Sequence, residues 1–277
     1  MVQSHFTSKK IARQSQPWLF LGLTLALTWL LEFLAAGILH RVPEGIVLVL
    51  RYLAGVTPIA VAAGLAHLRH DRAFQRDFWE RIIDVRRIPT RWWLVIFLFV
   101  PVKAALAALG DVLLGGEGIA LEAAARFLAQ PLLILPTLLF WLIFGPLPEE
   151  PGWRGYALDG LQVRRGPLAA SLIIGVVWSL WHLPLFFIES TWQATAVGLG
   201  TRRFWLYMFH ILLDAPIYTW IYNHTHRSTL AAVLFHFSVN GFGEAFALTP
   251  RAEVFQFLLA ILAAVLVVLF DFQRSNG

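Results

Sequence analysis

The chain has 277 residues, of which 58% are hydrophobic and 14% are charged, and its mean hydropathy is +0.67. This balance excludes an ordinary soluble domain of this length, which would alternate apolar and polar faces. The absence of cysteine excludes disulfides, thiol nucleophiles and cysteine metal ligands. The net charge of +5 comes from basic residues placed between apolar runs, so it does not indicate nucleic-acid binding.

Apolar runs long enough to cross a bilayer as helices follow one another along the whole chain. A spanning helix needs about 20 such residues, and a helix satisfies its own backbone groups in lipid. We therefore predict an all-α polytopic membrane protein that forms a single integral membrane domain over residues 1–277. We count about eight transmembrane helices by this length criterion. The predicted spans are 17–39, 46–68, 92–114, 127–148, 167–188, 203–223, 229–248 and 254–271.

Basic residues before the first span and in every second loop predict the orientation of the chain. The intervening loops hold few of them, and loops rich in lysine and arginine stay on the cytoplasmic side. We therefore expect the N- and C-termini in the cytoplasm, and the cell membrane as the location if the source is prokaryotic. The basic residues are Lys9, Lys10, Arg13, Arg69, Arg72, Arg76, Arg81, Arg86, Arg87, Arg91, Arg154, Arg164, Arg165, His224, His226 and Arg227.

The longest polar segment, about residues 70–91, contains an apolar stripe. Charged residues fill the other face of the same segment. This pattern is typical of an amphipathic helix that lies in the cytoplasmic interface of a membrane. Its apolar residues recur every four positions or lie beside that stripe: Phe74, Phe78, Trp79, Ile82 and Ile83.

The sequence Gly-Pro-Leu-Pro at 145–148 interrupts the fourth predicted span. Proline inside a helix removes a hydrogen bond, whereas proline at the first helical position is well tolerated. We predict a broken helix that restarts near Pro148, with Glu149 and Glu150 in its first turn. The helix dipole there favours ionised carboxylates, and broken helices at membrane depth belong around polar cavities.

Residues four positions apart share a face of a helix, whereas adjacent residues do not. Glu150 and Arg154 are therefore expected to form an ion pair, which leaves Glu149 free for chemistry. Trp178 lies one turn before His182 and would form a wall beside it. By the same spacing, the side chains of His236 and Asn240 are expected on one face.

A helical hairpin with its turn at Arg165–Gly166 would bring Glu149 and His182 to the same depth. Sixteen residues separate Glu149 from Arg165, and sixteen separate Gly166 from His182. At 1.5 Å per residue, both side chains would lie about 24 Å from the turn. His236, about 10 Å past the start of its own span, would complete a site in the inner half of the bilayer.

These residue types point to hydrolysis by one of two mechanisms. Glu149 could take a proton from water, while His182, His236 and Asn240 stabilise the oxyanion formed at a carbonyl. Alternatively, Glu149, His182 and His236 could hold a catalytic zinc with an open water position. The residues leave both the zinc-dependent and the metal-free alternative open.

Four other ionisable residues at membrane depth, Glu32, His210, Asp214 and Glu244, are expected to have structural roles. Two functions outside hydrolysis also remain open. A proton-coupled transporter could use the glutamates and histidines as a relay, although the chain lacks the repeat symmetry of many transporters. A non-catalytic immunity or scaffolding membrane protein would need no reacting groups.

Three motifs resemble those of the CAAX prenyl endopeptidase type II family, also called the CPBP or Abi family. Residues 149–155 resemble its EExxxRG motif, residues 178–182 its aromatic-xxx-His motif, and residues 236–240 its HxxxN motif. The motifs occur in the order typical of the family and cover about residues 130–245. The resemblance implies an intramembrane endopeptidase. In eukaryotic members of the family the substrate is a prenylated CaaX protein that loses three C-terminal residues.

The resemblance also implies roles for six site residues. Glu149 would activate water, and His182 would assist or bind the metal. His236 and Asn240 would hold the oxyanion or the metal, whereas the remaining pair, Glu150 and Arg154, would support the site. The expected partners are the lipid bilayer and a peptide or prenylated protein. Prokaryotic relatives are linked to bacteriocin maturation or immunity, so the resemblance does not identify one substrate.

Overall fold

A computed structural model describes residues 14–37, 42–68 and 71–273, and the predicted all-α class is confirmed. The α-helices are α2 (Pro17–Ala35), α3 (Glu44–Leu68), α4 (Arg72–Ile83), α5 (Thr90–Leu113), α6 (Glu122–Ala129), α7 (Ile134–Ile143), α8 (Pro146–Glu150), α9 (Asp159–Trp181), α10 (Arg202–His224), α11 (Thr229–Ala245) and α12 (Pro250–Val267). Shorter 3-10 helices span Val85–Arg87, Pro131–Leu133 and Leu183–Phe187, and π-helices span Pro151–Leu158, Gln193–Val197 and Val268–Phe272. Two short strands, β1 (Ile119–Ala120) and β2 (Ala247–Leu248), pair antiparallel.

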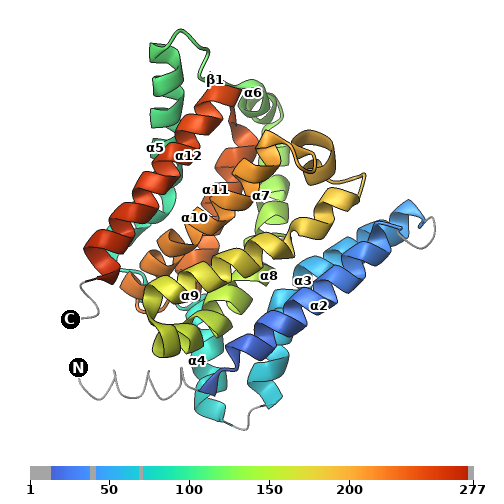
Figure 1. The fold of residues 1–277 in the computed structure, drawn as a ribbon, viewed down its shortest axis with the longest axis vertical. Helices are drawn as coiled ribbons and strands as arrows, with labels where there is room; N and C mark the ends of the chain where they lie inside the picture. Colours follow the sequence, from blue (N-terminus) through green and yellow to red (C-terminus); the bar gives the residue numbers. More distant parts are fainter. Residues whose placement is uncertain (1–13, 38–41, 69–70, 274–277) are drawn as a thin grey trace.

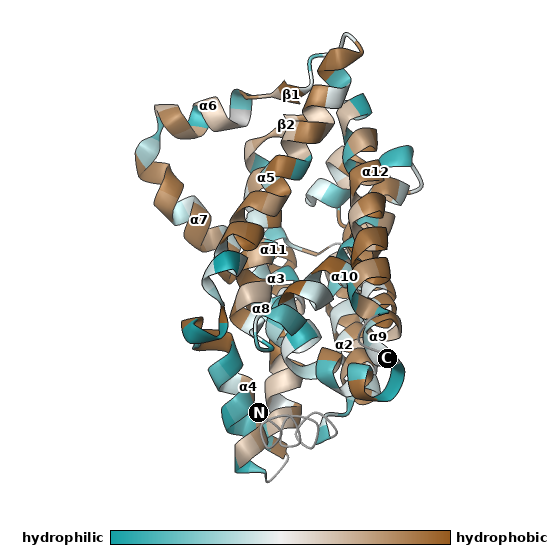
Figure 2. Cartoon of the chain, turned by 90° about the vertical axis from the view of Figure 1, so that its left-hand side faces the viewer, coloured by the Kyte–Doolittle hydropathy of each residue, from teal (hydrophilic) through white to brown (hydrophobic). Residues whose placement is uncertain are grey.

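The helices form a bundle in which α2 and α3 lie side by side, with α5 and α12 paired on the other side (Figure 1). Helix α9 packs along α10, and α8 lies between α3 and α11. Apolar residues cover much of the length of α5 and α12, and hydrophilic residues gather at α4 and near helix ends (Figure 2). Many of these apolar side chains are exposed, as lipid contact requires of a membrane protein.

Each predicted span coincides with helical structure, but the count of spans is not confirmed. In the described ranges, 5 helical segments are long and apolar enough to cross a membrane. Helices α10 and α11 are absent from that group, because α10 carries several polar residues and α11 has 17 residues. Helix α2 ends at Ala35, whereas the predicted first span ends at residue 39. Residues 38–41 lie outside the described part. Lys9, Lys10, Arg13 and Arg69 also lie outside it, and the predicted orientation stays a prediction.

Helix α4 forms inside the predicted segment 70–91, but lipid does not cover its apolar stripe. Asp71 caps the helix by accepting hydrogen bonds from the backbone N–H groups of Ala73 and Phe74. The stripe packs on α11, α3 and the π-helix Pro151–Leu158. Its buried members are Phe74, Phe78 and Ile82, whereas Trp79 and Ile83 are exposed. Trp79 and Ile83 thus lie beside the buried stripe, because residues one position apart point in different directions.

A buried ion network fixes α4 to the rest of the bundle. Arg81 donates hydrogen bonds to Asp159, at 3.1 Å, and to the hydroxyl of Tyr222. Arg227 donates to the same carboxylate of Asp159 and to Asp77. The network joins α4, α9, α10 and the loop before α11, so it holds one end of the bundle together.

The predicted helix break is present, and the new helix starts two residues earlier than expected. Helix α7 ends at Ile143, and Gly145 adopts φ −132° and ψ −100° before α8 begins at Pro146. The first four N–H groups of a helix have no partner within it, so prolines at 146 and 148 remove no helical hydrogen bond. Glu149 lies in the first turn as predicted, whereas Glu150 is the last residue of α8.

A π-helix continues the chain from Pro151 to Leu158, and the predicted hairpin turn follows at Gly166, with φ 79° and ψ 168°. Gly152 lies in the π-helix, pressed against α2 and α3. A Cβ atom at this position would lie 2.8 Å from the ring of Phe20 and 2.8 Å from the carbonyl oxygen of Pro58. The close approach of these three elements therefore requires glycine.

We expect Gly152→Ala to destabilise the protein by about 1–3 kcal/mol, because the added methyl group overpacks this contact. Gly64→Ala is the matched control, since a Cβ atom there meets nothing within 4 Å. Thermal unfolding in detergent measures both variants. Equal stability of the two would show that the contact with Phe20 and Pro58 is not restrictive.

Candidate active site

Glu149 is buried, and its carboxylate is held by a tryptophan of the facing helix. Trp178 of α9 donates its Nε1–H to Glu149 Oε2 at 2.8 Å. Glu149 as a whole residue is 7% exposed. The turn at Gly166 lies within α9 and reverses the chain, so Trp178 in the second limb reaches Glu149 in α8.

The residue that faces Glu149 is Trp178, one helical turn before His182. The predicted depth match between Glu149 and His182 stays a prediction, because this side-chain hydrogen bond does not measure the depth of either backbone. The prediction assumed a continuous α-helix from Glu149 to Arg165, but the first limb contains the π-helix. A π-helix advances less per residue than an α-helix, so the first limb is shorter than its residue count suggests.

Glu150 lies at the centre of a second, fully buried group. Arg154 Nη1 donates to both oxygens of Glu150 at 3.0 Å, which is the expected ion pair. His236 Nδ1 lies 2.9 Å from Glu150 Oε1. Glu150 is 0% exposed and Arg154 1% exposed, so breaking this pair would leave an uncompensated buried charge.

The guanidinium group of Arg154 lies between two aromatic rings. Its central carbon is 4.5 Å from the ring centroid of Trp178 and 4.1 Å from that of Tyr218. Cation–π contacts of this kind hold the planar group in one orientation. Arg154 thus connects the Glu150 carboxylate to the tryptophan that holds Glu149.

The partners of the two histidines determine which nitrogen of each ring is available. His182 Nδ1 lies 2.8 Å from the carbonyl oxygen of Trp178, and that oxygen only accepts hydrogen bonds. His182 therefore carries a proton on Nδ1, and in the neutral ring Nε2 is a free acceptor. By the same reasoning, His236 donates from Nδ1 to Glu150, and its Nε2 has no hydrogen-bond partner among the described residues.

A polar cavity of about 480 Å³ brings the second and third motifs together. His182, His236 and Asn240 line one part of it, together with Trp178 and Tyr218. Away from these residues the cavity follows one face of α10 and ends beside the salt bridge between Arg203 and Glu253. Its polar lining consists of Lys103, Trp178, His182, Arg203, Tyr207, His210, Asp214, Tyr218, His236, Asn240, Glu253 and Gln256.

The acidic motif lies behind the wall of this cavity. Its three residues do not line the cavity, but each contacts a residue that does. Glu149 is bonded to Trp178, Glu150 to His236, and Arg154 lies against the rings of Trp178 and Tyr218. Asn240, expected on the same face as His236, lies against the helix break. A Cβ atom on Gly145 would lie 3.0 Å from Asn240 Nδ2, so glycine at the break leaves room for this amide.

The proposed zinc ligands do not gather as a metal site requires. In the described ranges, no group of three or more histidine, aspartate or glutamate side chains is close enough to hold a metal ion. Each histidine has the oriented Nδ1–H and free Nε2 of a metal ligand. The carboxylate of Glu149 is bound to Trp178 instead of facing both imidazoles. The arrangement therefore does not fit the predicted three-ligand set.

Sequence reasoning missed three cavity residues, Lys103, Tyr207 and Tyr218. Tyr218 lies 5.8 Å from His236 between ring centroids, and its buried hydroxyl has no partner in the described part of the chain. A signal was present, because His210, Asp214 and Tyr218 are spaced by four residues and share one helix face. Glu244, in contrast, is exposed and lies outside the cavity lining.

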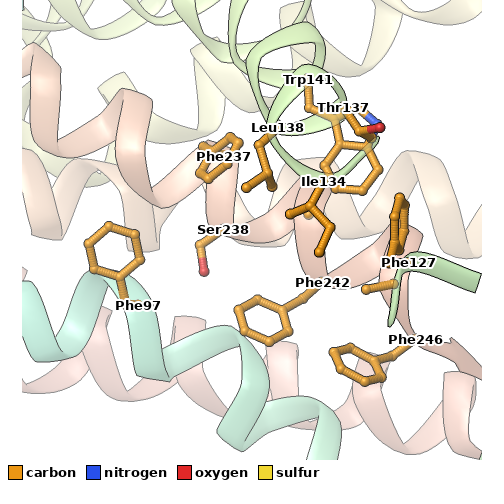
Figure 3. Close-up of a pocket in the computed structure, with 12 residues that line it drawn as sticks. Phe97, Phe127, Ile134, Thr137, Leu138, Trp141, Phe237, Ser238, Phe242 and Phe246 are labelled. Carbon is orange, nitrogen blue, oxygen red and sulfur yellow. The ribbon is translucent and has the colours of Figure 1, made fainter. Parts of the chain in front are cut away.

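A second, apolar cavity of about 270 Å³ is lined in part by α11, and Figure 3 shows residues around it. Phe97 of α5, Leu138 and Trp141 of α7, and Phe237 of α11 lie around it. The two cavities share lining residues at the end of α11, Phe242 and Phe246. One helix thus has a polar cavity on one side and an apolar cavity on the other.

Comparison with known proteins agrees with the motifs. Residues 131–242 match a family model described as Type II CAAX prenyl endopeptidase Rce1-like. The chain is 27% identical to CAAX prenyl protease 2 of Methanococcus maripaludis over 256 residues, which are 92% of this chain and 94% of that protein. The predicted similarity to the type II CAAX prenyl endopeptidases is therefore confirmed. It indicates an endopeptidase of the CAAX-protease type in an integral membrane protein.

We expect Arg154→Ala to destabilise the protein by about 3–5 kcal/mol, because it leaves the Glu150 carboxylate buried with His236 as its remaining partner. Arg154→Lys keeps the charge but not the planar stacking, so its effect should be smaller. Unfolding in detergent measures both. Full stability of Arg154→Ala would show that the buried ion pair is not needed for folding.

Proposed function

We propose, from the similarity to type II CAAX prenyl endopeptidases, that the chain is an intramembrane endopeptidase in which Glu149 activates the attacking water. The observation that carries this proposal is the Glu149–Trp178 hydrogen bond. It holds a buried carboxylate directly behind Trp178, which lines the polar cavity together with His182, His236 and Asn240.

In the proposed reaction, Glu149 accepts a proton from a water molecule as the water oxygen attacks the carbonyl carbon of the scissile peptide bond. The carbonyl oxygen becomes an oxyanion. The proton on Glu149 then passes to the leaving nitrogen, and the C–N bond breaks. A positioned general base of this kind contributes about 10²- to 10⁴-fold to the rate.

The cavity residues have complementary hydrogen-bonding roles in this proposal. Asn240 Nδ2–H can donate to the oxyanion. His236, whose ring is oriented by the Glu150 carboxylate at Nδ1, lines the cavity beside the proposed position of the oxyanion. His182 has a free acceptor at Nε2 in the neutral ring, so it can orient the water or receive the leaving N–H group.

We propose that the two cavities receive different parts of one substrate. The polar cavity can take a peptide, since donors and acceptors line its length. The apolar cavity, lined by Leu138 and several aromatic rings, suits the prenyl chain of a prenylated protein. The shared residues Phe242 and Phe246 allow one molecule to occupy both.

The role of Glu149 as the general base can be tested by substitution. Glu149→Gln keeps an oxygen that can accept from Trp178 but loses basicity, so cleavage of a prenylated CAAX peptide should fall by about 10²- to 10⁴-fold without loss of folding. Glu44→Gln, on an exposed residue of α3, is the control and should cleave normally. Normal turnover by Glu149→Gln would refute the role of Glu149.

A chelator distinguishes the zinc-dependent mechanism from the metal-free mechanism. If Glu149 activates water without a metal, purified protein free of zinc by elemental analysis should cleave the peptide in the presence of a chelator. Activity that disappears with the chelator and returns with added zinc would support the zinc alternative. In that case Glu149, His182 and His236 would be tested as ligands by zinc content after substitution.

The third prediction concerns the apolar cavity. Leu138→Trp should fill it and raise KM for a prenylated peptide, with little effect on the same peptide without the prenyl group. Leu139→Trp is the matched control, because Leu139 is the next residue on α7, is 46% exposed and lies outside the cavity lining. Equal effects of both variants, or none, would exclude the cavity as the prenyl site.

A further inference from the structure

A cluster of ionisable side chains lies inside the polar cavity, away from the groups proposed to act on the peptide bond. Lys103 of α5 and His210 and Asp214 of α10 all line this cavity. Lys103 Nζ lies 3.0 Å from His210 Nε2 and 3.7 Å from Asp214 Oδ1. The sequence suggested structural roles for His210 and Asp214 and did not single out Lys103.

The cluster has hydrogen-bonding capacity that its own members do not use. An ammonium group has three donors, and in the part of the chain that the structure describes the one hydrogen bond of Lys103 goes to His210. Asp214 Oδ1 is buried and has no hydrogen-bond partner in the ranges that the structure describes. Its distance from Lys103 is an ion-pair distance, too long for a hydrogen bond. The charge of Lys103 is therefore paired with that of Asp214, but its ammonium group has N–H donors without an acceptor among the described residues.

Unpaired hydrogen-bond donors at the position of Lys103 cost free energy, and a bound acceptor would remove this cost. Lys103 is the fourteenth of the 24 residues of α5, so it lies near the middle of that helix. Charged groups at such depth generally face a polar cavity and mark a functional site. A buried ammonium group with free donors favours an anionic acceptor.

We propose that Lys103, positioned by His210 and Asp214, binds the C-terminal carboxylate of the peptide substrate. This inference rests on the proposed function, since it requires a peptide in the polar cavity. A carboxylate is the anion that every unmodified peptide has at its end. It would accept hydrogen bonds from the free N–H donors of Lys103, and the imidazole of His210 lies beside it.

The spacing along α10 gives the length of the segment between the scissile bond and the anchor. Tyr218 marks the depth of the reacting groups, since its ring is 5.5 Å from Trp178 and 5.8 Å from His236. His210 lies eight residues earlier on the same helix face, which is about 12 Å at 1.5 Å per residue. An extended peptide covers about 3.3–3.6 Å per residue, so about three residues would lie between the scissile bond and Lys103.

The anchor would make the enzyme select chain ends over internal sequences. A peptide with a longer C-terminal segment could not place its carboxylate at Lys103 while its scissile bond lies at Tyr218. A C-terminal amide would lose the charge that the ammonium group recognises. Lys103 would thus determine specificity without contacting the reacting atoms.

Binding to the inactive Glu149→Gln protein tests this anchor independently of catalysis. The probes are a prenylated CAAX peptide with a free C-terminal carboxylate and the same peptide with a C-terminal amide. The free acid should bind about 10- to 100-fold more tightly, the range expected for a hydrogen bond to a charged partner. Equal binding of the two peptides, or binding of neither, would overturn the proposal.

Three further substitutions in the same background identify the residue responsible. Lys103→Met combined with Asp214→Asn removes both charges together, so no uncompensated charge stays buried, and it should abolish the preference for the acid. Lys103→Arg should retain part of it. Arg202→Met, at an exposed residue at the start of α10, removes a positive charge outside the cavity lining and should leave the preference unchanged. A preference that survives the double substitution would overturn the role of Lys103.

The cleavage assay keeps the two proposals separate. With Glu149 intact, the Lys103→Met and Asp214→Asn protein should show a higher KM for the free acid and little change in kcat. A preference for the acid in binding without cleavage by the native chain would refute the proposed endopeptidase and leave the anchor supported. Cleavage with equal KM for acid and amide would refute the anchor and leave the endopeptidase supported.

Discussion

The Glu150 carboxylate has no exposed surface and is held by Arg154 from the same broken helix and by His236 from α11. A charge at this depth is stable only when it is paired, because transfer from water to an apolar environment is very costly. This requirement links the two motifs in space: α11 must approach α8 closely enough for His236 to reach Glu150. The same contact determines the orientation of the His236 ring and leaves its Nε2 free.

The break at Gly145 and Pro146 provides the space in which this pairing occurs. A continuous helix would carry α7 directly into α8, with no room beside Gly145 for the amide of Asn240. A π-helix follows, and Trp178 of the returning limb donates a hydrogen bond to Glu149. Interruptions of this kind in a membrane helix are tolerated where they border a polar cavity, and the cavity lined by Asn240 and Trp178 meets that condition.

Helix α11 divides the interior into a polar and an apolar cavity, and the polar one extends beyond the family motifs. Residues 131–242, which match the family model, contain the groups proposed to react, whereas Lys103 belongs to α5 and lies outside that match. We propose that the motif region cleaves the peptide bond and that Lys103, on an earlier helix, binds the C-terminal carboxylate of the substrate. Chemistry and substrate selection would then reside on different helices of one cavity.

Local rules in the sequence were enough to predict the helical class, the helix break, the turn at Gly166 and the Glu150–Arg154 pair. Each depends on residues near one another in the chain: apolar run length, the position of a proline, or a spacing of four. The sequence alone also determined that His236 and Asn240 share a face. It could not determine that Trp178 donates to Glu149, since this depends on how the two limbs of the hairpin pack against each other.

Only the tertiary structure decided the contacts between helices that are distant in sequence. Trp178 with Glu149, His236 with Glu150, and Lys103 with His210 each join two such helices. These contacts depend on the rotation, the kink and the depth of each helix in the bundle. A shift of one residue along a helix would turn the side chain away from its partner. The physical reason is that helix periodicity determines which residues share a face, whereas packing between helices determines what that face meets.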